Sequence, residues 1–401
     1  MNDSLLQIFL LVCAASIVYS YVLYAPMIWL LSKLFGRPSA RAELRDDRLP
    51  SVSVLIAAHN EQDVIEARIL NALASDYPRE LVEIVVASDG STDATAAIVA
   101  RFADRGVKLI DSDARRGKSR VLNETVASLR GEIVLFSDAN THTDPAAVRK
   151  LVRWFVNNST GDDSTGGHPA GDASIGVVCG RLVLTDPATG RNVDSLYWKY
   201  ETFLKRCESR LGALLGSNGA IYAMRRALYQ RIPDDTLVDD FVIPLLAKQR
   251  TGCRIVYDGD AIAREETPRD LSSEFHRRSR IGAGGFQSIT ILWKLLNPRR
   301  GWVALTFFSH KILRWVCPFF MIGLVISNLL LLDRPVYRAL AIAQVAFYAI
   351  SAIAGWLPTS FRALRPLRLT TMFTAMNAAL FVGFFRWLFV GGSGAWRRTQ
   401  R

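Results

Sequence analysis

Cysteines are few in this sequence, and their spacing matches no metal or disulfide framework. The 401 residues include five cysteines, an odd number scattered along the chain, and two of them lie in apolar runs. A zinc site or a disulfide-stabilised fold needs paired and regularly spaced cysteines, and neither pattern occurs. No internal repeat is visible either. The sequence therefore excludes a cysteine-based metal site and a disulfide scaffold.

Charged residues are absent from four long apolar runs. The first run, residues 5–31, is long enough to cross a bilayer. It lacks a basic start and a small-residue cleavage site, so it predicts a membrane anchor rather than a cleaved signal peptide. Half of all residues are hydrophobic, which is consistent with membrane segments. The length of 401 residues is enough for a polar domain of about 250 residues beside them. Three further runs follow that domain, at residues 315–332, 339–361 and 369–385.

Basic residues next to the first run predict the side of the membrane on which the polar domain lies. Only Asp3 precedes the run, whereas five basic residues follow it, and cytoplasmic loops are enriched in Lys and Arg. The sequence thus predicts an integral protein of the plasma or inner membrane whose large domain is cytoplasmic. Four spans would place the basic C-terminus outside, against this tendency, so either the last run is re-entrant or the tendency is overridden there. The five basic residues are Lys33, Arg37, Arg41, Arg45 and Arg48.

Three predicted strands end in polar side chains. Residues 82–88 (VEIVVAS) read as a buried strand that ends at Asp89, Gly90 permits a tight turn, and residues 92–102 restart as a helix. Upstream, residues 51–62 form a strand that ends at Asn60 and Glu61, and downstream a third strand ends at Asp138. Open α/β sheets bind ligands at the carboxyl ends of their strands, so these side chains predict a nucleotide site.

Four further motifs complete a pattern that resembles glycosyltransferase family 2, in its membrane-bound branch of polysaccharide and chitooligosaccharide synthases. They are RRGKSRVLNE (115–124), GSNGAIYAMRR (216–226), LVDDFVIPLL (237–246) and FHRRSRIGAGG (275–285). The resemblance covers about residues 51–300. It implies an α/β nucleotide-sugar-binding domain of the GT-A type with transmembrane helices. The expected parts are an N-terminal transmembrane helix (1–35), the GT-A domain (51–268), interfacial amphipathic helices (269–314) and C-terminal transmembrane helices (315–392).

The resemblance implies roles on the donor side of the site. Asp89 matches the carboxylate that contacts the base or ribose, and Lys118 matches a basic residue near the diphosphate. The alternative for this motif is that Lys118 belongs to a basic run that is simply solvated and binds no diphosphate. Asp138, at a strand end, can also simply cap the next helix, which is the interpretation that this residue alone favours, and for Asp93 a capping role is as open as a ligand role. The other nucleotide contacts implied are Ala57, Asn60, Glu61 and Asp138.

A divalent cation, Mg or Mn, is the cofactor that the resemblance implies. Loss of a diphosphate from a sugar needs its charge neutralised, which a hard cation held by oxygen ligands does well. Asp138 and Asn140 in SDAN are the expected ligands. The family pattern is Asp-Xaa-Asp, so Asn140 departs from it and leaves one less negative charge.

The second half of the domain is expected to hold the acceptor. Ser217, Asn218 and Gly219 match the acceptor-side segment of the family, and Asp240 matches its catalytic base. Displacement at the anomeric carbon needs a base that takes the proton of the acceptor hydroxyl. Asp239 and Asp240 can also stabilise a helix start through the helix dipole.

An arginine motif near residue 280 is expected to contact the departing diphosphate. Arg277 and Arg280 align with the Gln/Arg-Xaa-Xaa-Arg-Trp motif of the processive members, and guanidinium groups suit diphosphates. Ile281 stands where the family has an aromatic residue, which puts processive polymerisation in doubt. The alternative is a basic face of an interfacial helix lying against anionic lipid.

The sequence therefore predicts an inverting, membrane-embedded glycosyltransferase that uses a nucleotide-sugar donor, UDP-linked by the resemblance. The acceptor is a saccharide, with a lipid-linked acceptor as the alternative. Membrane lipid and export partner chains are further expected partners, and nucleic acid is not. A nucleotide-binding transporter or scaffold is the alternative from another class, although binding alone needs no base.

Overall fold

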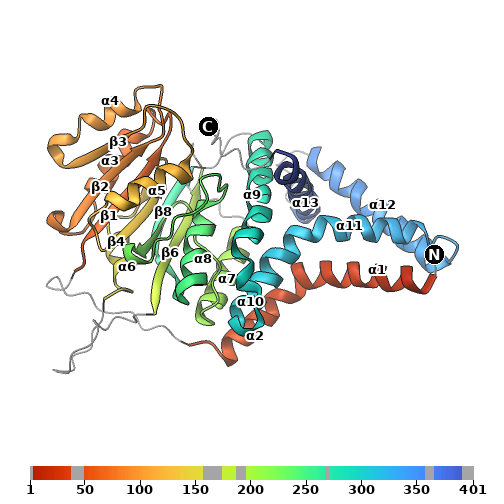
Figure 1. The fold of residues 1–401 in the computed structure, drawn as a ribbon. Coiled ribbons are helices and arrows are strands. Elements are labelled where there is room, and N and C mark those ends of the chain that lie inside the picture. The colour runs from red at the N-terminus through yellow and green to blue at the C-terminus, as the bar shows by residue number, and fades with distance from the viewer. Residues whose placement is uncertain are drawn as a thin grey trace. The chain divides into compact units, whose positions relative to one another are not determined.

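The computed structural model describes residues 3–37, 49–156, 174–186, 196–266, 271–356 and 365–390. The chain divides into two compact units (Figure 1). One contains residues 1–27, 270–289 and 307–391, and the other contains residues 28–269, 290–306 and 392–401. Arg41, Arg45, Arg48 and the basic C-terminus, on which the topology prediction partly rests, lie outside the described residues.

The second unit is built around one eight-stranded sheet. Its order is β3-β2-β1-β4-β7-β6-β8-β5. β1, β2, β3 and β4 run parallel, whereas β7 is antiparallel to both β4 and β6. The strands are β1 Val52–Ala58, β2 Val82–Ser88, β3 Val107–Asp111, β4 Ile133–Asp138, β5 His142–Thr143, β6 Ile175–Thr185, β7 Tyr222–Arg225 and β8 Arg254–Glu266.

The three strands predicted from the sequence, β2, β1 and β4, lie side by side in this sheet. Ala57 of β1 is in register with Ala87 of β2 on one side and with Asp138 of β4 on the other. The carboxyl ends of the three strands are therefore level, as predicted. The chain moves outward from β1 to β2 and β3 on one side and starts again at β4 on the other. This change of direction is where open α/β sheets form their ligand crevice.

Apolar strands and amphipathic helices form the core of the α/β unit. Ile56 and Ile84 of the sheet pack against Ile65 and Ile69, and all four side chains are fully buried. The helices are α3 Ile65–Leu73, α4 Thr95–Ala100, α5 Lys118–Ser128, α6 Ala147–Val152, α7 Leu196–Arg210 and α8 Asp239–Thr251. The predicted helix restart after Gly90 is α4, and the acidic pair Asp239-Asp240 opens α8.

Among the residues that the structure describes, four helices are long and apolar enough to cross a membrane: Asp3–Leu34, Trp302–Leu329, Pro335–Ala354 and Leu369–Phe389. The second of them begins at Trp302, earlier than the expected start at residue 315. The reason is that a π-helical segment, Phe307–Ile312, joins α10 to α11 without a break. The helices involved are α1 Asp3–Val18, α2 Tyr24–Leu34, α9 Leu271–Leu292, α10 Trp302–Thr306, α11 Leu313–Leu329, α12 Pro335–Trp356 and α13 Arg365–Val390.

Small residues allow the helices of the first unit to pack closely. A Cβ built on Gly383 of α13 would lie 2.7 Å from the Ser279 carbonyl oxygen of α9, and one on Gly323 of α11 would lie 3.0 Å from the Phe9 ring of α1. Polar pairs add to this packing, with Tyr19 Oη 2.8 Å from Ser309 Oγ. Glycines and interhelical hydrogen bonds are the usual means of helix association in bilayers, where apolar burial gives no driving force.

Candidate functional site

Two acidic side chains contact one lysine at the carboxyl end of β4, and the charge of a third, Asp240, acts on the same lysine. Lys118 begins α5, and its Nζ lies 2.9 Å from Asp138 Oδ1 and 3.1 Å from Asp239 Oδ2. The Lys118 side chain is only 20% exposed, so it is not part of a solvated basic run. The structure thus brings together a donor-side residue, the strand-end carboxylate and the first residue of α8, which are far apart in sequence.

Asp240 lies beside this ion cluster, and Gly219 separates it from Asp138. A Cβ built on Gly219 would lie 2.8 Å from Asp138 Oδ2 and 3.7 Å from Asp240 Oδ2, so only glycine leaves space between the two carboxylates. Ser217 fixes the backbone of Asp240, because its Oγ and its N–H donate to the Asp240 carbonyl at 2.7 and 3.2 Å. The predicted acceptor-side segment therefore positions the predicted base.

The charges of the cluster shift the pKa of two groups in the direction that catalysis needs. Burial, with Asp239 and Asp138, raises the pKa of the Asp240 carboxyl to about 6, although Lys118 and Lys205 oppose this. Burial disfavours the Lys118 ammonium, but Asp138, Asp239 and Asp240 outweigh it, so its pKa is raised. At neutral pH Asp240 is thus a carboxylate that accepts a proton readily, and Lys118 stays charged.

The Asp89 side chain is buried and accepts hydrogen bonds from backbone N–H groups. The residue is 1% exposed, and its carboxylate accepts hydrogen bonds from the N–H of Arg116 at 2.6 Å and of Gly117 at 2.9 Å. These amides form the turn that starts α5, so Asp89 positions Lys118. A direct contact of Asp89 with the nucleotide stays a prediction.

The loops after β1 and β2 are tied together by the predicted nucleotide contacts. Asn60 has a left-handed backbone (φ 55°), and its Oδ1 accepts the N–H of Thr92 at 2.8 Å. The N–H of Glu61 donates to Thr95 Oγ1 at 2.8 Å, and Asp93 Oδ1 accepts the N–H of Thr95 at 2.9 Å. The capping role considered for Asp93 is therefore present, and the loop pair is held rigid.

Other predicted residues lie at the margin of the cluster or outside it. Ala57 lines a small cavity of about 10 Å³ with Lys118, Asp138 and Asp239, room for roughly one water molecule. Asn218 Nδ2 donates to the Gly180 carbonyl at 2.9 Å and so serves the local backbone. Asn140 lies two residues after the end of β4, and its role as a ligand stays a prediction.

The arginine motif belongs to the other compact unit. Arg277 and Arg280 lie on α9, both half-buried and three residues apart, on one side of that helix. Their expected contact with a diphosphate stays a prediction. Ile281, where the family has an aromatic residue, is 41% exposed.

Two buried residues near the cluster were not predicted from the sequence. Arg68 of α3 is 1% exposed, and burial lowers its pKa to about 10 while the charge of Asp138 raises it. Tyr222 of β7 stacks on Phe136 at 4.7 Å and lines the small cavity. The signal for Arg68 was an arginine on the apolar face of a short helix, at a position that burial alone would give to an aliphatic residue.

The donor set of the cluster fits a divalent cation. Three carboxylates and one ammonium give the cluster a net charge of two negative units. Gly219, which has no side chain, leaves space between the Asp138 and Asp240 oxygens. In the part of the chain that the structure describes, no group of three or more His, Cys, Asp or Glu side chains is placed so that it could hold a metal ion by itself. The remaining ligands would then come from diphosphate oxygens and water, as is usual for Mg²⁺.

The comparison with protein families identifies the α/β unit. Residues 53–166 match the family described as Glycosyl transferase family 2. The chain carries a family 2 glycosyltransferase domain. Two curated proteins to which the chain is similar are named as a glycosyltransferase and a polysaccharide synthase. The probable glycosyltransferase YdaM of Bacillus subtilis is 26% identical over 261 residues, 62% of this chain and 57% of that protein.

The second relative is the poly-beta-1,6-N-acetyl-D-glucosamine synthase of Staphylococcus epidermidis. It is 22% identical over 293 residues, 67% of this chain and 66% of the relative. The chain thus spans less than two thirds of the length of these relatives. A solved mannosyltransferase of Pyrobaculum calidifontis, in complex with GDP-Man and Mn2+, is 20% identical and has a TM-score of 0.71, over 96% of this chain and 99% of that one. This likeness shows the fold, and the predicted GT-A architecture of the glycosyltransferase domain is confirmed.

Proposed function

We propose that the glycosyltransferase domain transfers a sugar from a UDP-linked donor to a saccharide acceptor with inversion, in the synthesis of a polysaccharide or oligosaccharide at the membrane. The observation that carries the proposal is the cluster of Asp138, Asp239 and Asp240 around Lys118, at the crevice of the sheet. Pure nucleotide binding needs no carboxylate with a pKa near 6, whereas general base catalysis does.

Each residue of the cluster has a distinct task in this proposal. Asp240 accepts the proton of the acceptor hydroxyl as the hydroxyl oxygen attacks the anomeric carbon from the face opposite the leaving group. Lys118 places a fixed positive charge beside the departing diphosphate. Asp138 holds Lys118 and shares in binding a divalent cation, which neutralises diphosphate charge when bound. The fold accommodates such a pair, since the mannosyltransferase of the same fold was solved with GDP-Man and Mn2+.

A lipid-linked acceptor is the second candidate, and Ile281 favours it. An aliphatic side chain cannot give a sugar ring the broad face that an aromatic residue offers. A growing chain would then be held less firmly between additions. Release after one or a few transfers follows from this, so the expected products are short oligosaccharides or a glycolipid.

Purified, detergent-solubilised full-length chain is expected to release UDP from a UDP-sugar when a saccharide or lipid-linked acceptor is present. A panel of UDP- and GDP-sugars, with released nucleotide measured, identifies the donor, and sizing of labelled product identifies the mode. No nucleotide release from any donor would support the transporter or scaffold alternative. High-molecular-weight polymer made by the purified chain alone would contradict early release.

The glycosyltransferase domain is expected to be cytoplasmic because Lys33 and Arg37 follow the first span. Protease added to intact right-side-out cells should leave residues 51–300 uncut, and detergent permeabilisation should expose them. Measurement is by immunoblot with an antibody against this region. Cleavage in intact cells would reverse the proposed orientation.

A further inference from the structure

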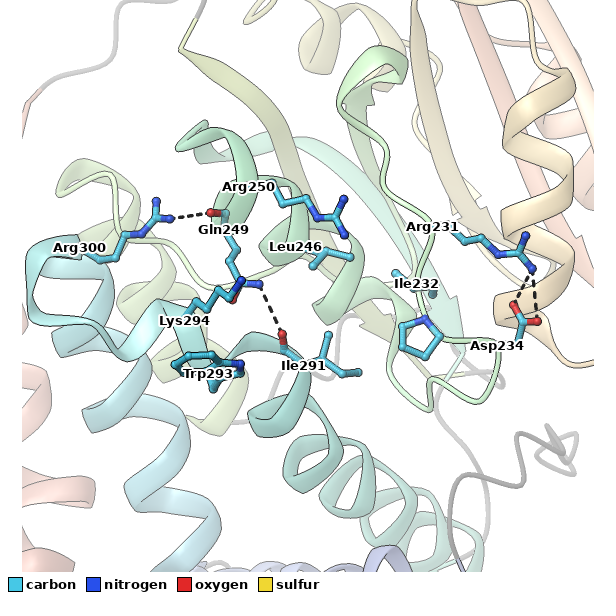
Figure 2. Close-up of a pocket in the computed structure, with 11 residues that line it drawn as sticks. Arg231, Ile232, Asp234, Leu246, Gln249, Arg250, Ile291, Trp293, Lys294 and Arg300 are labelled. Atoms are coloured by element: carbon cyan, nitrogen blue, oxygen red, sulfur yellow. Dashed lines mark hydrogen bonds and ion pairs between the residues drawn. The ribbon is translucent and has the colours of Figure 1, made fainter.

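A second, larger cavity lies in the α/β unit, away from the acidic cluster. Its volume is about 890 Å³, and three segments form its walls (Figure 2). They are the loop 231–234, the face of α8 that carries Leu246, Gln249 and Arg250, and the segment 291–300, which begins in the last turn of α9. No residue of the acidic cluster lines it.

Positive charge dominates the lining. Four basic residues, Arg231, Arg250, Lys294 and Arg300, face one acidic residue, Asp234. Arg231 pairs with Asp234 at 3.4 Å (Figure 2). Arg250 and Arg300 donate instead to neutral oxygens, the Gln230 side chain at 2.7 Å and the Gln249 carbonyl at 2.6 Å. Three positive charges therefore lack an acidic neighbour among the described residues, which makes the cavity attractive to an anion.

Gln249 presents a buried hydrogen-bond acceptor to the cavity. Its residue is 9% exposed, and its Nε2 donates to the Ile291 carbonyl at 3.4 Å. Its Oε1 has no hydrogen-bond partner in the described structure. A buried carbonyl oxygen without a donor is costly, so a ligand that carries a hydroxyl group would be stabilised there.

One side of the cavity is apolar and lies close in sequence to a candidate span. Trp293, 60% exposed, and Ile291 lie on this side. The segment continues into Trp302, the first residue of the span Trp302–Leu329, and the Trp302 ring packs at 5.5 Å on Phe35, directly after the span Asp3–Leu34. Tryptophan together with Lys and Arg beside a span is typical of the membrane–water interface.

The wall opposite this segment is held in place by α5. Asn123 Nδ2 donates to the Ile232 carbonyl at 2.8 Å, and Asn123 Oδ1 accepts the N–H of Ile232 at 3.0 Å. Ser119 Oγ donates to the Thr236 carbonyl at 2.8 Å. The loop 231–234 is therefore fixed to α5 of the protein core.

We propose that this cavity binds the headgroup of an anionic phospholipid. The phosphate lies among Arg250, Lys294 and Arg300, a headgroup hydroxyl such as that of glycerol donates to Gln249 Oε1, and the apolar part of the lipid lies along Trp293. A cavity with a basic rim, a buried acceptor and an apolar side next to a span matches each part of such a lipid. The proposal does not depend on the transfer reaction.

Native mass spectrometry of the full-length chain in neutral detergent tests this directly, by counting bound phosphatidylglycerol against phosphatidylcholine. Lys294→Gln is expected to weaken phosphatidylglycerol binding about fivefold. Arg299→Gln is the matched control, because Arg299 lies in the same segment and carries the same charge but does not line the cavity. Gln249→Leu should weaken binding of phosphatidylglycerol and leave binding of phosphatidic acid, which lacks the headgroup hydroxyl, unchanged.

Two results would overturn the proposal. Equal weakening by Lys294→Gln and Arg299→Gln would mean diffuse attraction to surface charge. Displacement of phosphatidylglycerol by free glycerol 1-phosphate at the same concentration would mean that the cavity selects a soluble phosphate ester and not a lipid. Because the readout is lipid binding, failure here leaves the proposed transfer reaction untouched, and loss of transferase activity leaves this result unchanged.

Discussion

Asp240→Asn is expected to lower the rate of sugar transfer by about 100- to 10,000-fold, the usual contribution of general base catalysis. Asparagine keeps the shape of the side chain but cannot take up the proton of the acceptor hydroxyl. Donor binding should stay nearly intact, because Lys118 still pairs with Asp138 and Asp239. Nucleotide release measures the rate, and equilibrium binding of UDP measures the donor site.

The pH dependence gives this prediction a second readout. A base must be deprotonated to act, and burial beside Asp239 raises the pKa of Asp240 to about 6. The rate of the native chain should therefore be constant well above pH 6 and fall about tenfold per pH unit below it. Asp104→Asn, which alters an exposed carboxylate of the same unit, should retain both the rate and this profile. Near-native turnover of Asp240→Asn would rule out Asp240 as the base.

Removal of divalent cations is expected to stop transfer, and Asp138→Ala should have a comparable effect, on the order of 100-fold or more. The reason is that the cluster has two surplus negative charges, which suit a cation but repel a diphosphate without one. Activity is measured after treatment with EDTA and again after Mg²⁺ or Mn²⁺ is added back. The add-back also determines which metal the site prefers.

Asp138→Ala needs a control, because it also removes a partner of Lys118. Asp239→Asn removes the other ionised partner and keeps Asp138, so the two variants separate metal binding from the placement of the lysine. Asp138→Ala should raise the concentration of Mn²⁺ needed for half-maximal activity more than Asp239→Asn does, because both variants remove one negative charge but only the first removes a proposed ligand. Full activity in excess chelator would contradict the cation, and Lys118, Arg277 and Arg280 would then be the leading candidates to neutralise the diphosphate.

The local pattern of the sequence determined the central strands, the fold class and the apolar helices. β2 has the bounds of the VEIVVAS run, β4 ends at Asp138 as predicted, and β1 ends at Ala58, two residues before Asn60. This succeeded because a buried parallel strand is a continuous apolar run and a membrane helix is an uncharged one, so both are visible within a short window. Asp138 was singled out at a predicted strand end, whereas Lys118 and Asp240 were singled out by their resemblance to family motifs, and the roles of all three stay predictions.

The tertiary structure decided what those residues contact. Packing between distant segments places Lys118 between Asp138 and Asp239. It also brings Asp89 to the backbone amides before α5 and buries Arg68 near the site. A sequence does not show which backbone amides will face a given carboxylate. The pKa of Asp240 likewise depends on burial and on neighbouring charges, which only folding creates. The basic cavity is invisible in the sequence for the same reason, since its three walls come from separate segments that meet only in the folded unit.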